Sequence, residues 1–310
     1  MANQFNLASA TSPVIREIMR RRTEEVHNGT KLGLVIEGGG MRGVISAGVL
    51  AFMEEYGLGG VFDEVYAESA GAVNGAYFVA GQARYGSRIY CDNLRFKEFL
   101  NFWRLRKVMD LDYATDKVVG ETRKLDCGRL RSSRTRLFVS LTHAISAQKA
   151  IVDIQQVSVP VLSVLKASSA AVPLYNHPVI VGGEPYVDGG ISDPIPVMNA
   201  VRSGCTHILV LFTRPISFQP GALSAWEEAC VRLFGRWWSP ALREAFRSRW
   251  RHVLEARNVA LGFTPTERDV AIAVIAPPDE SPKVTRVSRD PRLLDAALNA
   301  SFDQARGVFL

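Results

Sequence analysis

The sequence contains no hydrophobic run that could cross a bilayer and no pattern of paired cysteines. Its longest apolar runs, HILVLF and VAIAVIA, are far shorter than the roughly 20 residues of a transmembrane helix. The four cysteines, Cys91, Cys127, Cys205 and Cys230, form no C-x-x-C pair. The N-terminal stretch MANQFNLASATSPVIREIMRRR lacks the apolar core of a signal peptide. These absences predict a cytoplasmic protein with free thiols that reaches membranes only peripherally.

Internal repeats, low-complexity runs and flexible linkers are also lacking. With 310 residues and 47% hydrophobic content, the chain can bury a large core, so we expect an N-terminal arm or helix over residues 1–30 and one domain over 31–310. The net charge is +6, and basic residues mixed with aromatics gather in 84–136 and 226–257. Such segments suit either solvated helices over a core or a surface for anionic lipid headgroups. No nucleic-acid motif accompanies the charge, so no nucleic-acid partner is expected.

Short β-rich runs alternate with amphipathic stretches along most of the chain. The runs lie at residues 32–36, 61–66, 137–141, 150–154, 207–212 and 270–275. This alternation predicts a three-layer α/β/α sandwich with a largely parallel central sheet, in which sites form at the carboxyl ends of strands. Residues 84–136 and 213–265 are expected to be helical excursions from the sheet, and either could cover the site.

A glycine-rich turn follows the first predicted strand, in LGLVIEGGGMRGVISAGVL. Gly38, Gly39, Gly40 and Gly43 leave backbone N–H groups uncovered at the start of a helix, where they can hold a pyrophosphate or an oxyanion. The spacing also fits a dinucleotide-binding fingerprint, but that fold requires an acid at the end of the second strand. Here the second strand leads into a serine. Arg42, inside the turn, could support an anionic headgroup or pair with a neighbouring acid.

That serine lies in VYAESAGAVNGAY, which has the strand, tight turn and helix of a nucleophile elbow. The usual elbow pattern is G-x-S-x-G, whereas this chain has Ala67-Glu68-Ser69-Ala70-Gly71. Alanine is the smallest side chain that could replace the missing glycine, so we expect the elbow to tolerate Ala67.

A second turn, Asp188-Gly189-Gly190, places a carboxylate next to two glycines after a short strand. A D-G-G triplet is common in surface turns, but its position near a strand end, in a chain with an elbow, favours a functional role. Ser168 and Ser169, earlier in the chain, are expected to end a helix packed against the sheet, and no chemistry is assigned to them.

Together GGGMRG, the serine elbow, ASSA and DGG resemble the patatin-like phospholipase family in order and spacing. The resemblance extends from about residue 31 to a predicted C-terminal helix near 293–308. It implies a lipid acyl hydrolase of the phospholipase A or lysophospholipase type that needs no metal or other cofactor. In that family the glycine-rich turn forms the oxyanion hole, the elbow serine is the nucleophile and the aspartate is its base. Carried over, these roles fall on residues 38–43, Ser69 and Asp188.

An aspartate base limits the chemistry. An exposed aspartate has a pKa of about 3.9, so Asp188 must be desolvated or held against Ser69 to act as a general base. Its low basicity favours esters, whose leaving groups need less protonation than amines. An α/β-hydrolase would instead need a histidine, and His207 and His252 follow the serine and the acid in the required order. We expect both, and His177, to be structural or surface residues, since none follows a strand as the two turns do.

The expected substrate is a phospholipid, lysolipid or other acyl ester, with peripheral contact to anionic membranes. Two alternatives stay open. An acyltransferase or cyclising thioesterase would resolve the same acyl-serine with an alcohol or amine. A catalytically silent lipid-binding module would not react with a fluorophosphonate.

Overall fold

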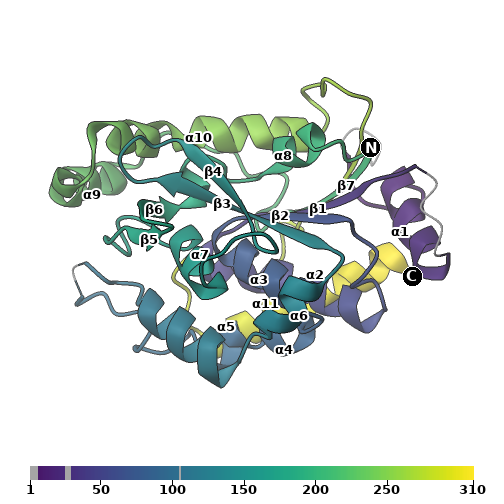
Figure 1. The fold of residues 1–310 in the computed structure, drawn as a ribbon, viewed down its shortest axis with the longest axis horizontal. Coiled ribbons are helices and arrows are strands. Elements are labelled where there is room, and N and C mark those ends of the chain that lie inside the picture. Colours follow the sequence, from purple (N-terminus) through teal and green to yellow (C-terminus); the bar gives the residue numbers. More distant parts are fainter. Residues whose placement is uncertain (1–5, 25–28, 105) are drawn as a thin grey trace.

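The computed structural model describes residues 6–24, 29–104 and 106–310, which form an eight-stranded sheet with helices on both faces (Figure 1). The strand order is β5-β6-β3-β2-β1-β7-β8, with β4 also paired to β3. The strands are β1 (Leu32–Ile36), β2 (Glu64–Ala67), β3 (Arg136–His143), β4 (Lys149–Asp153), β5 (Val179–Val181), β6 (Glu184–Asp188), β7 (His207–Leu211) and β8 (Ala271–Ile275). Strands β3, β2, β1, β7 and β8 are parallel, whereas β4, β5 and β6 add antiparallel pairs.

Helices form a layer on each face of the sheet. One layer contains α8 (Val197–Arg202), α9 (Ala225–Phe234) and α10 (Pro240–Ala260). The other contains α2 (Gly43–Glu55), α3 (Ser69–Val79), α4 (Ala83–Ser87), α5 (Ile89–Asp92), α6 (Cys127–Ser132), α7 (Val161–Ser168) and α11 (Pro291–Phe309). The predicted three-layer α/β/α fold is therefore confirmed. No helix in the described part of the chain is long and apolar enough to span a membrane.

The central elements are apolar because they are covered on both sides. Every residue of β1 is buried, as expected of a parallel strand between two helical layers. Helix α2 is buried from Gly43 to Met53, because it is packed between the sheet and α11. A Cβ at Gly48 would lie 2.4 Å from the carbonyl oxygen of Leu298, so glycine permits the close approach of α2 and α11.

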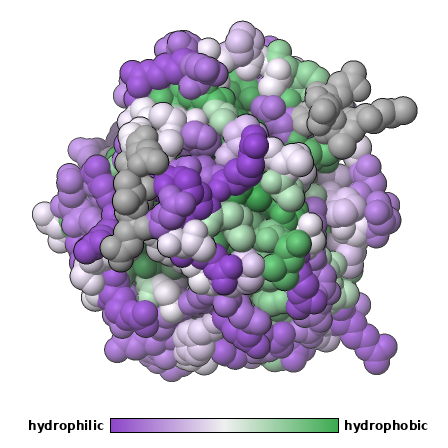
Figure 2. Space-filling model, turned by 90° about the vertical axis from the view of Figure 1, so that its right-hand side faces the viewer, coloured by the Kyte–Doolittle hydropathy of each residue, from purple (hydrophilic) through white to green (hydrophobic). Residues whose placement is uncertain are grey.

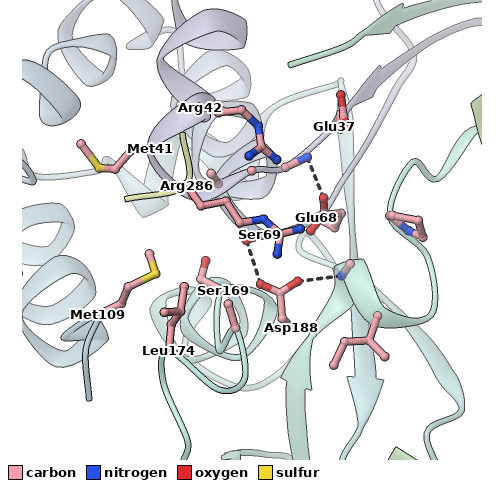
Figure 3. Close-up of a pocket in the computed structure, with 18 of the residues that line it drawn as sticks. Glu37, Met41, Arg42, Glu68, Ser69, Met109, Ser169, Leu174, Asp188 and Arg286 are labelled. Atoms are coloured by element: carbon pink, nitrogen blue, oxygen red, sulfur yellow. Dashed lines mark hydrogen bonds between the residues drawn. The ribbon is translucent and has the colours of Figure 1, made fainter. Parts of the chain in front are cut away.

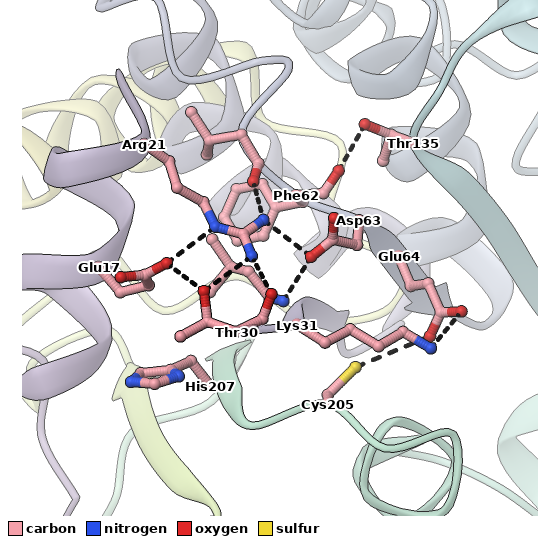
Figure 4. A network of polar contacts seen from close by, with 12 residues as sticks. Glu17, Arg21, Thr30, Lys31, Phe62, Asp63, Glu64, Thr135, Cys205 and His207 are labelled. Carbon is pink, nitrogen blue, oxygen red and sulfur yellow. Dashed lines mark hydrogen bonds and ion pairs between the residues drawn. The ribbon is translucent and has the colours of Figure 1, made fainter. Parts of the chain in front are cut away.

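Helix α1 (Pro13–Thr23) is fixed to the amino ends of the strands by the buried Arg21 (Figure 4). The Arg21 guanidinium donates to Glu17 Oε1 at 2.9 Å, to Asp63 Oδ2 at 2.8 Å and to the carbonyl of Val61 at 3.0 Å. Asp63 Oδ2 also accepts the N–H of Leu32, the first residue of β1, at 2.6 Å. Figure 2 shows this end of the molecule, where hydrophilic residues surround an apolar area.

Two sequence expectations about local structure differ in part from the structure. The strand expected at 61–66 begins only at Glu64, because the carbonyls of Val61 and Phe62 accept from Arg21 and Thr135 side chains. Residues 84–136 are only partly helical: a loop closed by a bridge between Leu100 and Met109 precedes the π-helix η3 (Asp112–Thr122).

Candidate active site

Ser69 occupies a sharp turn between β2 and α3, as the elbow pattern predicts. Its φ is +53°, a left-handed conformation that costs a residue with a side chain roughly 1–2 kcal/mol. The Ser69 N–H donates to Ser168 Oγ at 2.8 Å, and that hydroxyl donates to the carbonyl of Ser140 at 2.8 Å. These two hydrogen bonds connect the strained turn to β3 through the side chain of Ser168, which is fully buried.

Asp188 ends β6, directly across from β3, and contacts Ser69. Ser69 Oγ donates to Asp188 Oδ2 at 2.9 Å, and the N–H of Gly190 donates to Asp188 Oδ1 at 2.7 Å. A Cβ at Gly189 would lie 2.1 Å from the carbonyl oxygen of Ser140, so no residue other than glycine fits there. The structure thus brings together the serine and the aspartate that the sequence singled out, which are 119 residues apart.

The glycine-rich turn lies beside Ser69, and much of its backbone is already hydrogen-bonded. The N–H of Gly38 donates to Glu68 Oε1 at 2.6 Å, and that of Met41 donates to the carbonyl of Arg286 at 3.1 Å. The N–H groups of Arg42 and Gly43 donate back into the turn.

The N–H groups of Gly39 and Gly40 have no hydrogen-bond partner among residues 6–24, 29–104 and 106–310. Gly40 has φ of +60°, and a Cβ there would lie 2.8 Å from the Arg286 carbonyl oxygen, so both conformation and space require glycine. Two adjacent free donors next to a serine hydroxyl are the arrangement that binds a developing oxyanion.

Two buried carboxyl groups adjoin the serine, and burial raises the pKa of each. The pKa of Glu68 is well above its usual range because of burial and the nearby charge of Asp188. The pKa of Asp188 is raised by burial, an effect opposed by hydrogen bonds from Gly190 and Ser69. The two carboxyl groups interact directly, since the charge of Asp188 raises the pKa of Glu68 and a hydrogen bond from Glu68 lowers that of Asp188. A raised pKa makes Asp188 a stronger base than an exposed aspartate.

The other predicted site residues occupy structural positions around the elbow. Ala67 is fully buried at the end of β2, so its methyl group is part of the core. Gly71 lies in the first turn of α3, where a Cβ would be 2.6 Å from the carbonyl oxygen of Ile36. A buried Arg42 points into the pocket (Figure 3) without an ion-pair partner in the described part of the chain, so pairing with an acid, one of the two alternatives for this residue, is not seen.

The two histidines that fit the chain order of an α/β-hydrolase, and His177, lie elsewhere. His207 starts β7, at the amino end of the sheet, and its Nδ1 contacts Thr206 Oγ1 at 3.0 Å. His252 lies on the exposed face of α10, 3.7 Å from Glu255. Neither these two nor His177 lines the pocket that contains Ser69.

That pocket has a volume of about 420 Å³ (Figure 3). Apolar side chains line it on the side of α5 and η3, among them Met109 and Leu174. The turn after β1, the segment after β7 and helix α10 contribute arginines to the lining, together with apolar residues such as Phe246 and Trp250.

Sequence reasoning missed several residues of this site. It left Ser168 without a role, although ASSA was one of the recognised motifs, and it treated Glu68 as a variable position of the elbow. It also missed the pocket arginines Arg214, Arg249 and Arg286, which lie in segments without a motif. Only the clustering of basic residues in 226–257 hinted at one of them.

The described residues thus form an α/β sandwich in which a serine elbow adjoins a glycine-rich turn. The sequence profile of the patatin-like phospholipase family matches residues 34–201, and the chain belongs to that family. This membership supports lipid acyl hydrolysis as the general class of activity.

Individual proteins are also similar to the chain. The uncharacterized protein YjjU of Escherichia coli (strain K12) is 33% identical over 192 residues, which are 60% of this chain and 52% of YjjU. The chain thus spans about half the length of this curated relative. The crystal structure of VipD from Legionella pneumophila superposes with a TM-score of 0.54 at 14% identity, covering 90% of this chain and 66% of VipD. At that identity the likeness concerns the fold alone.

Proposed function

We propose that the protein is a lipid acyl hydrolase of the phospholipase A or lysophospholipase type, with Ser69 as nucleophile and Asp188 as general base. The observation that carries this proposal is the 2.9 Å hydrogen bond from Ser69 Oγ to Asp188 Oδ2 at a strained elbow. It lies in a pocket lined by apolar side chains that would accommodate an acyl chain.

The reaction follows from these contacts. Ser69 Oγ attacks the ester carbonyl carbon as its proton passes to Asp188 Oδ2, and the carbonyl oxygen becomes an oxyanion held by the N–H groups of Gly39 and Gly40. Collapse of the tetrahedral intermediate breaks the ester C–O bond, and Asp188 returns the proton to the leaving alcohol or lysolipid. Water, deprotonated by the same carboxylate, then attacks the acyl-serine; the Ser69 Oγ–acyl bond breaks, the fatty acid leaves, and Asp188 returns the proton to Ser69 Oγ.

Loss of either side chain tests the dyad. Ser69→Ala should abolish both turnover of a short-chain ester and labelling by a fluorophosphonate. Asp188→Asn keeps the shape but not the base, so turnover should fall by roughly 10²–10⁴-fold. Steady-state kinetics and mass spectrometry of the labelled peptide measure these effects.

His207→Gln and His252→Gln are the matched controls and should retain most activity. A histidine variant as inactive as Ser69→Ala, together with an active Asp188→Asn, would refute the dyad. Products formed with added alcohols or amines at the expense of hydrolysis would favour the acyltransferase alternative. A protein whose Ser69 resists the probe would be a lipid-binding module.

We further propose that the enzyme contacts anionic membranes through the loop of residues 96–104. Phe102 is 56% exposed and Trp103 is 94% exposed, and basic residues flank them at Lys97 and Arg104. Exposed aromatics next to cations are typical of surfaces that insert into the headgroup region.

A further inference from the structure

The pocket around Ser69 contains more positive charge than the proposed ester hydrolysis requires. Four arginines line it: Arg42, Arg214, Arg249 and Arg286. They come from four separate segments that converge at the carboxyl end of the sheet, namely the turn after β1, the segment after β7, helix α10 and the loop before α11. The Arg286 backbone is fixed there by the hydrogen bond from the N–H of Met41.

Protein carboxylates neutralise only part of this charge. Arg249 Nη2 pairs with Glu227 Oε1 at 2.5 Å, whereas Arg42, Arg214 and Arg286 form no ion pair within the described ranges. Arg42 Nε is buried without any hydrogen-bond partner, and the Arg214 guanidinium lies 3.8 Å from the centre of the Phe218 ring.

The other acids near the arginines form no ion pair with Arg42, Arg214 or Arg286 in the described part of the chain. The charge of Arg286 lowers the pKa of Asp188 and of Glu68 from a distance. Glu37 Oε2 accepts the N–H of Thr213 at 2.6 Å, and Glu68 accepts that of Gly38. The arginines also repel one another: burial, Arg286 and Arg214 lower the pKa of Arg42 to about 9. Clustered cations with a buried N–H left unpaired are costly unless an anion binds between them.

The opposite side of the pocket has no such charge. It is lined by Leu94, Phe99, Met109, Leu111, Val119 and Leu174. In Figure 3, Met109 and Leu174 lie on one side of Ser69, and Arg42 lies on the other. An ester placed at Ser69 would therefore extend an apolar chain one way and a polar headgroup the other.

We propose that the arginine side of the pocket is a headgroup subsite for phosphate, so that the preferred substrates are acyl esters with a net negative phosphate-bearing headgroup. Arg42, Arg214 and Arg286 supply the free donors, and Arg249 adds charge from α10. Guanidinium groups suit this role because their N–H groups pair with two phosphate oxygens at once. This inference rests on the proposed hydrolase function, which it narrows to a substrate class.

The kinetic test compares octanoyl esters that differ only in headgroup: lysophosphatidic acid, lysophosphatidylcholine and monoacylglycerol. We expect kcat/KM for lysophosphatidic acid to exceed the other two by at least about tenfold, the contribution of one charge-assisted hydrogen bond. Arg214→Gln and Arg286→Gln should each lower the ratio of kcat/KM for the phosphate ester to that for the neutral ester by roughly tenfold. Arg214→Lys should restore part of it. Arg251→Gln, an exposed α10 position outside the pocket, should leave the ratio unchanged.

A binding test is independent of catalysis. Ser69→Ala protein is titrated by calorimetry with octyl phosphate, octanol and inorganic phosphate, and circular dichroism checks the fold of each variant. Octyl phosphate should bind at least about tenfold more tightly than octanol, and Arg214→Gln should remove the difference. Inorganic phosphate binding as tightly as octyl phosphate would indicate a free-phosphate site and overturn the headgroup assignment.

The two proposals fail differently. If esters are hydrolysed with the same kcat/KM whatever the headgroup, and neither glutamine variant changes the kcat/KM ratio, the subsite is refuted. The hydrolase proposal is then unaffected. Phosphate-dependent binding of octyl phosphate without hydrolysis of any ester would support the subsite and refute the hydrolase.

Discussion

Glu68 connects the glycine-rich turn with the D-G-G turn through one carboxyl group. Its Oε1 accepts the N–H of Gly38. Its Oε2 lies close to Gly190: a Cβ added at Gly190 would be 3.0 Å from Glu68 Oε2 and 2.9 Å from Asp188 Oδ1. The protonated carboxyl also lowers the pKa of Asp188 through a hydrogen bond between the two side chains. Glu68 thus helps to keep the base ionised.

The ionisation of Glu68 should limit activity at alkaline pH. Its pKa in the folded protein is raised, so Glu68 keeps its proton to higher pH than an exposed glutamate and loses it as the pH increases through that raised value. The resulting charge would lie beside Asp188 and oppose oxyanion formation. We expect kcat/KM of the wild type to decline on the alkaline side, and Glu68→Gln, which stays neutral, to lose that decline.

Glu68→Ala is the informative companion, because it leaves the Gly38 N–H unpaired and should reduce activity at every pH. Superimposable pH profiles of kcat/KM for the wild type and Glu68→Gln would contradict this role for Glu68.

How far the sequence predicted the site depended on how local each signal was. Ser69, Asp188 and the glycines 38–40 lie in turns whose residue types limit the backbone conformation, so the turns were visible within a few residues. Ser168 and Arg286 reach the site from segments that are distant in the sequence. A serine at a helix end or an arginine in a loop has no local sequence pattern that would identify it. Such contacts depend on segments that are brought together across the sheet.

At the scale of elements, the apolar composition of the buried strands predicted where they lie. The burial of side chains in the segment after α5 could not be predicted in this way. The loop of residues 96–104 mixes aromatics that separate in the fold: Phe99 is buried, whereas Phe102 and Trp103 are exposed. The two tryptophans after α9 separate likewise, since Trp238 is buried and bonded to Asn176 while Trp237 is 48% exposed and stacks with Arg106. Alternation of burial in irregular segments cannot be predicted from periodicity.

The exposed tip of this loop should govern membrane binding. Trp103→Ala should weaken binding to phosphatidylglycerol vesicles by roughly tenfold, because an exposed aromatic ring loses its insertion into the interface. Trp103 does not line the pocket, so hydrolysis of a soluble short-chain ester should be unaffected. Vesicle sedimentation at low and high salt measures the effect.

Phe263→Ala, an exposed aromatic beyond the other end of α10, is the control and should bind vesicles as the wild type does. Wild-type binding that is equal for phosphatidylglycerol and phosphatidylcholine, and insensitive to salt, would mean that these residues form an ordinary solvated surface.

At the scale of the whole molecule, helix α1 shares the core of the domain. Val14, Ile15 and Ile18 are buried in the same cluster as β1 and α2. Arg21 connects this helix to Asp63, and through Asp63 to the first residue of β1. Because the side chain of Arg21 is only 1% exposed, removing one partner would leave a buried charge, which typically costs about 3–5 kcal/mol.

This network should make the protein sensitive to acid. Hydrogen bonds from Arg20, Thr30 and Arg21 lower the pKa of Glu17 from 4.5 to about 2, so the folded state binds the proton more weakly than the unfolded chain. The contribution of Glu17 to stability is therefore complete above pH 4.5 and is lost as the pH falls toward 2.

We expect Glu17→Gln to lower the free energy of unfolding at pH 7, with a difference from the wild type that shrinks steadily toward pH 2. Urea titrations across this range measure it, with Glu24→Gln as the control, because an exposed pair of this kind contributes at most about 1 kcal/mol. A Glu17→Gln difference that stays constant from pH 7 to pH 2 would show that packing of the side chain, and not its charge, fastens α1 to the sheet.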